Sequence, residues 1–221
     1  MNDKNDKREI SIPPPQENYE TSLGIVRKNL EGCDMKERAE KAEAVWNEST
    51  REIQVTLLGR DLVVSADGLE VSEPSGGKVD LWEKIIVLHY LLTATGKKKT
   101  GKYITYKEIP DGRLYWPNFI ARVHKPLLAA FGSRPGLLTE IASGMGGIPC
   151  DQGDVGVVIP ALPMVDLVYL IWEGDDEFEP EAGTLFDATI TDYLPAEDII
   201  MMSSMTAIKM MKIAFSKGGD K

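Results

Sequence analysis

The sequence predicts an α+β fold: a compact single domain in which a small antiparallel sheet and a mixed sheet pack with about six helices. Three observations predict it. Segments with helical spacing and segments with alternating spacing come in clusters, without the regular strand–helix–strand alternation of parallel sheets. The 221 residues are 43% hydrophobic and 27% charged, as in ordinary globular proteins. A chain of this length buries enough apolar surface to fold without disulfides.

The N-terminal part predicts two helices followed by an antiparallel meander. Residues 1–16 are polar and include three consecutive prolines, so we expect a disordered tail before a single domain over 17–216. Apolar residues recur at helical spacing over 19–30, and a second, more polar helix is predicted over 35–46. Over 53–71 the period changes to two, with turns at glycines, which is typical of short strands.

The rest of the chain predicts four more helices and several strands. The helices are expected over 81–95, 117–131, 135–143 and 195–215, and the strands over 103–106, 155–159, 165–172 and 185–186. Proline stands at the start of three of these helices, where its missing N–H does no harm. The segment 165–172 is nearly all apolar, as a central buried strand should be.

Charge and composition exclude several classes of protein. The net charge of −10 argues against a nucleic-acid binder, which needs a basic face. No apolar run reaches the ~18 residues of a membrane span, and the charged N-terminus lacks the apolar core of a signal peptide. We therefore expect a cytoplasmic protein with no membrane partner. Its two cysteines, Cys33 and Cys150, are too few for an iron–sulfur cluster.

One segment approaches a phosphate-binding motif. Residues 96–102 match the spacing of a P-loop, but Tyr103 stands where a Ser or Thr hydroxyl would bind Mg²⁺. A P-loop also follows a strand and opens a helix, whereas this segment follows a helix and opens a strand. We expect a solvated basic loop that binds no nucleoside triphosphate.

The two histidines are expected to differ. His89 lies in the most apolar helix, where a buried imidazole hydrogen-bonded to backbone or to a carboxylate is the simpler interpretation. A ligand to a metal or cofactor is the alternative. His124 lies in a more polar predicted helix next to Lys125, so we expect it to be solvated.

The charge distribution is the most informative feature. From 135 to 208 there are 14 Asp and Glu residues and no Lys, Arg or His, so the remainder carries a net charge of +4. We expect the acidic third to fold back on the more basic remainder, since like charges at this density repel. Some of its carboxylates should then face a shared cavity; the candidates are Asp175, Glu177, Asp187 and Asp198.

The densest acidic segment directly follows the apolar strand. It includes Glu173, Asp175, Asp176 and Glu177. Three interpretations remain open: a solvated structural loop, a binding surface for a basic partner, and a site for a hard cation or acid–base chemistry. We expect the aromatic and apolar residues around it to be buried and to hold it to the core; these are Trp172, Phe178, Leu185 and Phe186.

Four segments resemble a known family in order and spacing. They are Leu88-His89-Tyr90-Leu91-Leu92, the stretch from Trp172 to Phe178, Leu185-Phe186-Asp187, and the stretch from Tyr193 to Asp198. The chain is similar to an uncharacterised bacterial and archaeal family, domain of unknown function 3786. The resemblance implies a protein of anaerobic organisms that takes part in iron–sulfur or corrinoid metabolism, because some family members carry an appended iron–sulfur domain. Any such cluster would belong to a partner of this chain.

The leading hypothesis is a cytoplasmic, non-catalytic accessory or binding protein that acts with an iron–sulfur or corrinoid protein. The alternative is an enzyme that uses carboxylates or a divalent metal in the acidic region 172–198. In both cases the site is expected in a cleft beside that region. The candidate ligand-binding residues are His89, Trp172, Glu173, Asp175, Asp176, Glu177, Asp187 and Asp198.

Overall fold

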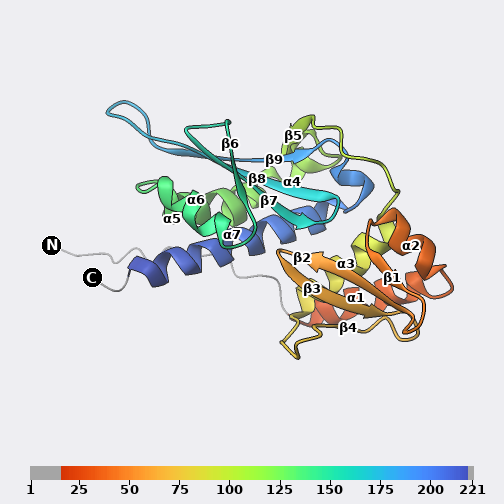
Figure 1. Cartoon of the computed structure of the whole chain (residues 1–221). Helices are drawn as coiled ribbons and strands as arrows, with labels where there is room; N and C mark the ends of the chain where they lie inside the picture. Colours follow the sequence, from red (N-terminus) through yellow and green to blue (C-terminus); the bar gives the residue numbers. More distant parts are fainter. Residues whose placement is uncertain (1–15, 219–221) are drawn as a thin grey trace.

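The computed structural model describes residues 16–218, so the predicted tail over 1–16 lies almost wholly outside the described residues. The α+β class is confirmed: two sheets pack with helices (Figure 1). In the described part of the chain there are six helices, apart from two short 3₁₀ turns, when the continuous run 112–131 is counted as one. The single domain over 17–216 stays a prediction, although one connected cluster of buried apolar side chains includes residues of both sheets.

The first half of the chain forms a four-stranded meander covered by three helices. The helices are α1 (Gln16–Leu30), α2 (Met35–Lys41) and α3 (Leu81–Thr93). The strands, in their order across the sheet, are β1 (Val45–Asn47), β2 (Glu52–Leu57), β3 (Arg60–Ser65) and β4 (Val71–Ser72). Ile53, Val55 and Leu57 alternate with more exposed residues and are buried, as the two-residue period predicts.

The predicted helix over 35–46 is too long. Helix α2 ends at Lys41, and Glu43 has a φ of 49°, which a continuing helix does not allow. The chain then extends, and Trp46 pairs with Ile53 across the first sheet. Valine and tryptophan at 45 and 46 suit a strand better than a helix, so strand β1 was missed by the sequence pattern.

The second half forms a five-stranded sheet with the order β5-β9-β8-β7-β6. Its strands are β5 (Tyr103–Thr105), β6 (Ile148–Cys150), β7 (Val155–Leu162), β8 (Val165–Trp172) and β9 (Glu181–Asp187). Every pairing in both sheets is antiparallel, so the mixed sheet is a correction. Short turns join β6 to β7, and β7 to β8, whereas a parallel pair needs a long crossover.

The helices of this half lie along the inner face of the sheet. They are α4 (Gly112–Phe119), a π-helical turn (Ile120–His124), α5 (Lys125–Phe131), α6 (Gly136–Ser143) and α7 (Ala196–Gly218). The helical run begins at Gly112, five residues before the predicted start, and contains Pro117 in its interior. A side chain at Gly112 would meet the carbonyl of Tyr106 at 1.8 Å, so only glycine fits there.

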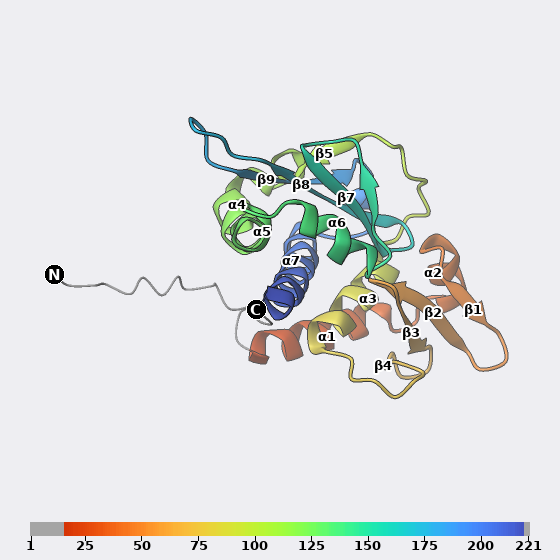
Figure 2. The ribbon, with the colours of Figure 1, turned by 60° about the vertical axis from the view of Figure 1, so that its left-hand side comes forward.

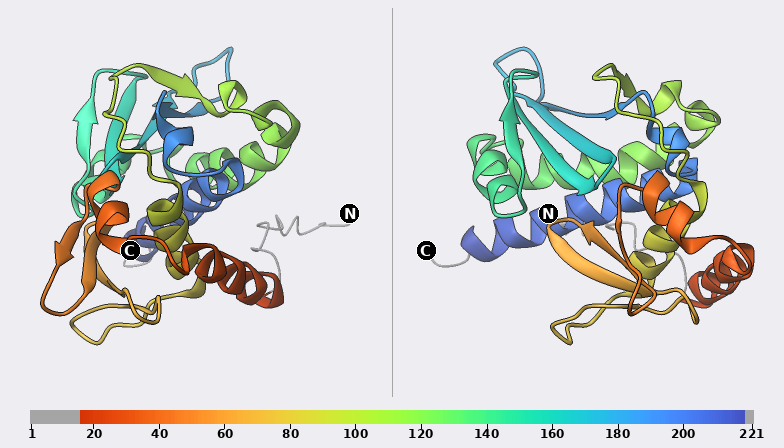
Figure 3. Two further views of the ribbon diagram at one scale, coloured as in Figure 1. Left: turned by 90° about the vertical axis from the view of Figure 1, so that its right-hand side faces the viewer. Right: turned by 45° about the vertical axis from the view of Figure 1, so that its right-hand side comes forward.

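Helix α7 runs between the two halves, with the sheets on opposite sides of it (Figures 2 and 3). Tyr90 of α3 also joins them, because its hydroxyl donates to the carbonyl of Ala42 (2.6 Å) and accepts from the amide of Met164 (3.1 Å). A backbone bond from Leu58 to Ala161 (2.9 Å) links the first sheet to the second.

Helix α7 is also long and apolar enough by composition to cross a membrane. Over Ala196–Lys217 its mean hydropathy reaches 1.3, and 56% of that window is buried inside the fold. The core helix of a soluble protein gives the same signature. Its contacts with α3, α5 and α6 explain the apolar composition, since a helix that packs on several sides is apolar on several sides.

Candidate functional site

Two of the predicted site residues, far apart in sequence, come together. Nδ1 of His89 on α3 lies 2.6 Å from Oδ2 of Asp198 in the first turn of α7. Of the two partners expected for His89, backbone or a carboxylate, the structure shows the carboxylate, but the imidazole is half-buried rather than buried. Asp198 is only 3% exposed. Burial raises the pKa of its carboxyl above the ordinary value, and the hydrogen bond with His89 opposes that rise.

The pair lines a cavity of about 350 Å³ between four helical segments. Tyr19 of α1, Tyr115 and Asn118 of α4, and Arg122 of the π turn are among the other lining residues. No carboxylate in the described residues lies within ion-pair distance of Arg122. When Nδ1 of a histidine is held by a carboxylate, Nε2 is the nitrogen left for a ligand or a proton.

Asp187 has a structural role away from this cavity. Its carboxylate accepts hydrogen bonds from the backbone N–H groups of Thr100 (3.1 Å), Gly101 (2.7 Å) and Thr189 (3.0 Å). Burial alone would raise its pKa, but the bonds from Thr189, Thr100 and Gly101 lower it to about 2. Asp187 therefore fastens the basic loop to the end of β9.

The acidic residues after β8 do not converge. Glu173, Asp175, Asp176 and Glu177 are all exposed, on a loop that projects from the molecule between β8 and β9 (Figures 1 and 2). Asp175 turns back on its own loop, because it accepts from the amides of Glu177 and Phe178 (both 2.8 Å), which lower its pKa. Within residues 16–218, no group of three or more His, Cys, Asp or Glu is placed to hold a metal ion.

The expected apolar anchors are only partly correct. Phe186 is fully buried and Leu185 half-buried, but Trp172 is 40% exposed and Phe178 is 70% exposed. Trp172 lies at the end of β8 on the outer face of the sheet, where its ring covers Gly183. Phe178 lies in the projecting loop, away from the core cluster of the described residues. Burial of Trp172 and Phe178 is therefore a correction.

The acidic third does fold back on the basic loop. Lys97 pairs with Asp192 (3.1 Å) and Lys99 with Asp166 (2.7 Å). The expectation of one shared cavity is wrong, because Asp187 and Asp198 lie in separate places and Asp175 is exposed. The exposed lysines contribute little stability individually.

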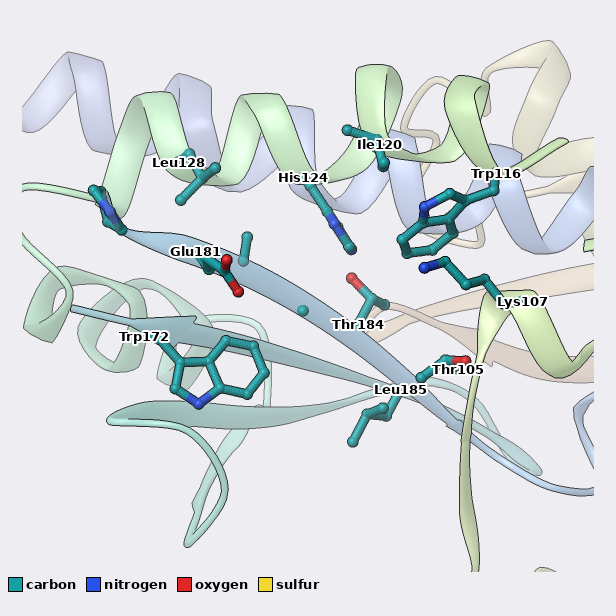
Figure 4. Close-up of a pocket in the computed structure, with 13 residues that line it drawn as sticks. Thr105, Lys107, Trp116, Ile120, His124, Leu128, Trp172, Glu181, Thr184 and Leu185 are labelled. Atoms are coloured by element: carbon teal, nitrogen blue, oxygen red, sulfur yellow. The ribbon is translucent and has the colours of Figure 1, made fainter. Parts of the chain in front are cut away.

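A second cavity, of about 480 Å³, lies where the helical run passes over β9 (Figure 4). Trp116, Ile120, His124 and Leu128 line it from the helix, and Glu181 to Leu185 line it from the strand. Trp172 closes one side, and Lys107 lies over the Trp116 ring at 4.4 Å. We call this cavity the β9 groove.

His124 belongs to this groove, which corrects the expectation that it is solvated. It is 8% exposed and packs edge-on against Trp116 and Phe119, with ring centroids 5.4 Å away in each case. Burial, with a smaller contribution from Lys107, lowers the pKa of His124 to about 4, so the imidazole is neutral at pH 7. Figure 4 shows it pointing toward Thr184.

Two polar atoms in the groove lack hydrogen-bond partners. Nε2 of His124 and Oγ1 of Thr184 are buried and unpaired, and the described residues contain only one other such side-chain atom, in Arg27. An unpaired buried polar atom costs about 1–3 kcal/mol. The spacing of Trp116, Ile120 and His124, four residues apart, is the one sequence signal that could have placed these residues on a common face.

Comparison with known proteins gives the family but no role for a residue. The model of the family described as a domain of unknown function (DUF3786) matches residues 34–209. No curated protein and no solved structure matches the chain. The match covers most of the chain, including the β9 groove, the His89–Asp198 pair and the loop between β8 and β9, but not Tyr19, which also lines the first cavity. It agrees with the resemblance noted in the sequence. The chain belongs to the family of this domain of unknown function.

Proposed function

We propose that the protein is a cytoplasmic, non-catalytic accessory protein that docks a basic partner protein. The observation that supports this best is the acidic loop 173–179, which projects from the fold and carries an exposed aromatic ring at Phe178. The β9 groove opens at the base of this loop. Three of the residues that line the groove directly precede or follow the loop: Trp172, Pro180 and Glu181.

The two features supply complementary parts of a docking surface. Exposed carboxylates attract a basic surface and speed its encounter, but they contribute little to final affinity. Aromatic side chains that become buried supply most of the affinity at protein interfaces. Trp172, Phe178 and Trp116 are the aromatic residues in or next to this surface.

The partner that the family resemblance favours is an iron–sulfur or corrinoid protein. Family members with an appended iron–sulfur domain supply such a unit on the same chain. In this chain Cys33 lies after α1 and Cys150 at the end of β6, and both are free thiols. The cluster or corrinoid would therefore sit in the partner.

A site-specific crosslinking experiment tests the proposal. A photoreactive amino acid replaces Phe178 in the full chain, and the matched control replaces Glu20, which is exposed on α1. In an anaerobic lysate we expect a discrete adduct from position 178 that is missing from position 20. Asp175→Lys with Glu177→Lys should abolish it. Identical adducts from both positions, or an adduct that survives the charge reversal, would contradict docking at the loop.

A second candidate function is acid–base catalysis at the His89–Asp198 cavity, favoured by the 2.6 Å contact and by the guanidinium group of Arg122, which lines the same cavity. Of the carboxylates in the region 172–198 that the sequence suggested for an enzyme, this site uses Asp198. The metal-dependent form of the carboxylate enzyme would instead hold a divalent ion at the acidic loop, which lies apart from this cavity. In that case millimolar Ca²⁺, Mg²⁺ or Mn²⁺ should raise the melting temperature by mass action. Asp175→Asn with Glu177→Gln should remove that rise. No shift with any of the three ions would exclude the metal-dependent version.

A further inference from the structure

Strand β9 has a free edge beside the β9 groove. On one side it pairs with β8 from Glu181 to Leu185. On the other side β5 pairs only with Leu185, Phe186 and Asp187, because the chain leaves the sheet after Thr105 in a 3₁₀ turn. No strand in the described part of the chain pairs with the outer edge of residues 181–184. Unpaired strand edges are templates for another strand.

The backbone of this edge presents its hydrogen-bonding groups outward. The amide of Ala188 donates to the carbonyl of Lys102 (2.8 Å), which lies on the β5 side. Because alternate residues of an antiparallel strand point to the same side, the amide and carbonyl groups of Thr184 and Ala182 also point there. Within residues 16–218, no other group hydrogen-bonds to these four backbone atoms.

The side walls of the groove define what an added strand would meet on each face. On the inner face, Thr184 and His124 present their unpartnered Oγ1 and Nε2 atoms. On the outer face, the Trp172 ring lies over Gly183. Because Gly183 has no side chain, the ring is the apolar surface that an added strand would meet there. Glu181 and the acidic loop stand at one end of the edge, and Lys107 stands at the other.

We propose that the edge from Glu181 to Thr184 binds an extended segment of a partner protein as an added β-strand. The inference rests on the proposed docking function and gives its mode of recognition. Backbone bonds to Ala182 and Thr184 hold the segment, as in other cases of strand addition. Side chains directly opposite each other on two strands share a face, so the groove also selects the sequence of the segment.

The selected sequence follows from the walls. Opposite Thr184 the segment carries a Ser, Thr or Asn, whose side chain gives Thr184 and His124 the missing partners. Opposite Gly183 it carries a large apolar residue that packs against Trp172. At the Glu181 end it carries Lys or Arg, which the acidic loop attracts.

The test is selection of random peptides, displayed on phage, against the full chain. We expect the enriched peptides to share one pattern: a polar residue opposite Thr184, a large apolar residue opposite Gly183 and a basic residue near Glu181. Ala182→Pro removes one outward amide without removing a bond to β8, so it should weaken these peptides about tenfold or more. The matched control Ala182→Gly keeps the amide and should bind within about twofold of the wild type. Failure to enrich peptides, or equal binding to the proline variant, would overturn the proposal.

Two further measurements do not depend on the fold of the proline variant. Synthetic peptides methylated on alternate backbone nitrogens should lose binding in one register of methylation and keep it in the other. Bound peptide should slow amide hydrogen exchange at Ala182 and Thr184. Loss in neither register, or unchanged exchange at both amides, would overturn strand addition. A crosslink at Phe178 that is insensitive to Ala182→Pro would leave docking intact and remove only strand addition.

Discussion

Nδ1 of His89 lies 2.6 Å from Oδ2 of Asp198, and this contact fastens α3 to the first turn of α7. The carboxylate is almost fully buried, while the imidazole side chain keeps 23% of its surface exposed in the cavity. The pair thus joins the two halves of the chain and leaves part of the imidazole open to the cavity.

Removal of Asp198 tests the structural part of this role. Asp198→Ala leaves Nδ1 of the half-buried His89 without its carboxylate partner, so the free energy of unfolding should fall by about 2 kcal/mol. Asp198→Asn keeps an acceptor oxygen and should lose clearly less. Urea denaturation of both variants measures the difference. Equal losses in the two variants would mean that the hydrogen bond does not hold the helices together.

Asp187 should make the protein sensitive to acid in a defined range. Its pKa is lowered from 3.8 to about 2 in the fold, so its stabilisation is complete above pH 3.8 and is lost as the pH falls toward 2. At pH 7 Asp187→Asn should therefore unfold with about 2 kcal/mol less free energy than the wild type. The gap should close near pH 2. A gap that stays constant down to pH 2 would contradict the assignment.

His124 should also make stability depend on pH, but in a higher pH range than Asp187. Protonation gives the imidazole a positive charge, whereas it removes the negative charge of Asp187. Its pKa falls from 6.5 to about 4 on burial, so the unfolded chain binds a proton more readily than the folded chain between these values. Stability should decrease as the pH drops from 6.5 to 4, by up to about 3 kcal/mol. His124→Gln cannot titrate and should lack this part of the slope. Parallel slopes for both proteins in thermal unfolding would refute the prediction.

Exposure distinguishes two of the aromatic residues that were expected to hold the acidic loop to the core, Phe186 and Trp172. Phe186 is fully buried, so Phe186→Ala should cost about 3–5 kcal/mol of unfolding free energy. Trp172 is 40% exposed, and Trp172→Ala should cost about 1 kcal/mol, near the middle of the range for single substitutions. Guanidinium denaturation compares them. A larger loss for Trp172→Ala would show that its ring over Gly183 bears more of the stability than its exposure indicates.

The periodicity of apolar residues correctly predicted those strands and helices whose burial is set within one segment. The apolar run of β8, the alternation of Ile53, Val55 and Leu57, and the apolar helix α3 are readable because each buries a face or stripe of its own. The charge map also predicted that the acidic third folds back on the more basic remainder, and Lys97 and Lys99 of the basic loop pair with Asp192 and Asp166 there. His89 was expected to bond to backbone or a carboxylate, and the carboxylate is Asp198.

The groove could not be predicted because it depends on contacts between distant segments. Ile104 pairs with Phe186, and the early end of that pairing creates the free edge of β9. His124 is buried because the helical run crosses this edge, although Lys125 follows it directly in the sequence. Trp172 ends an apolar run, and only the pairing of β8 with β9 shows that its side chain faces outward. No residue pattern in one segment contains these relations.

The hydroxyl of Tyr90 also limits how the chain can be divided. Each sheet is contiguous in sequence, β1 to β4 before α3 and β5 to β9 after it, so the basic loop looks like a natural cut. Yet Tyr90 bonds to Ala42 before that cut and to Met164 after it. A fragment ending in the loop would expose the apolar side of α3 that α7 covers. If the two halves were expressed as separate chains, each would be incompletely folded until it met the other. We therefore expect the two fragments to fold together when mixed, and neither to fold alone.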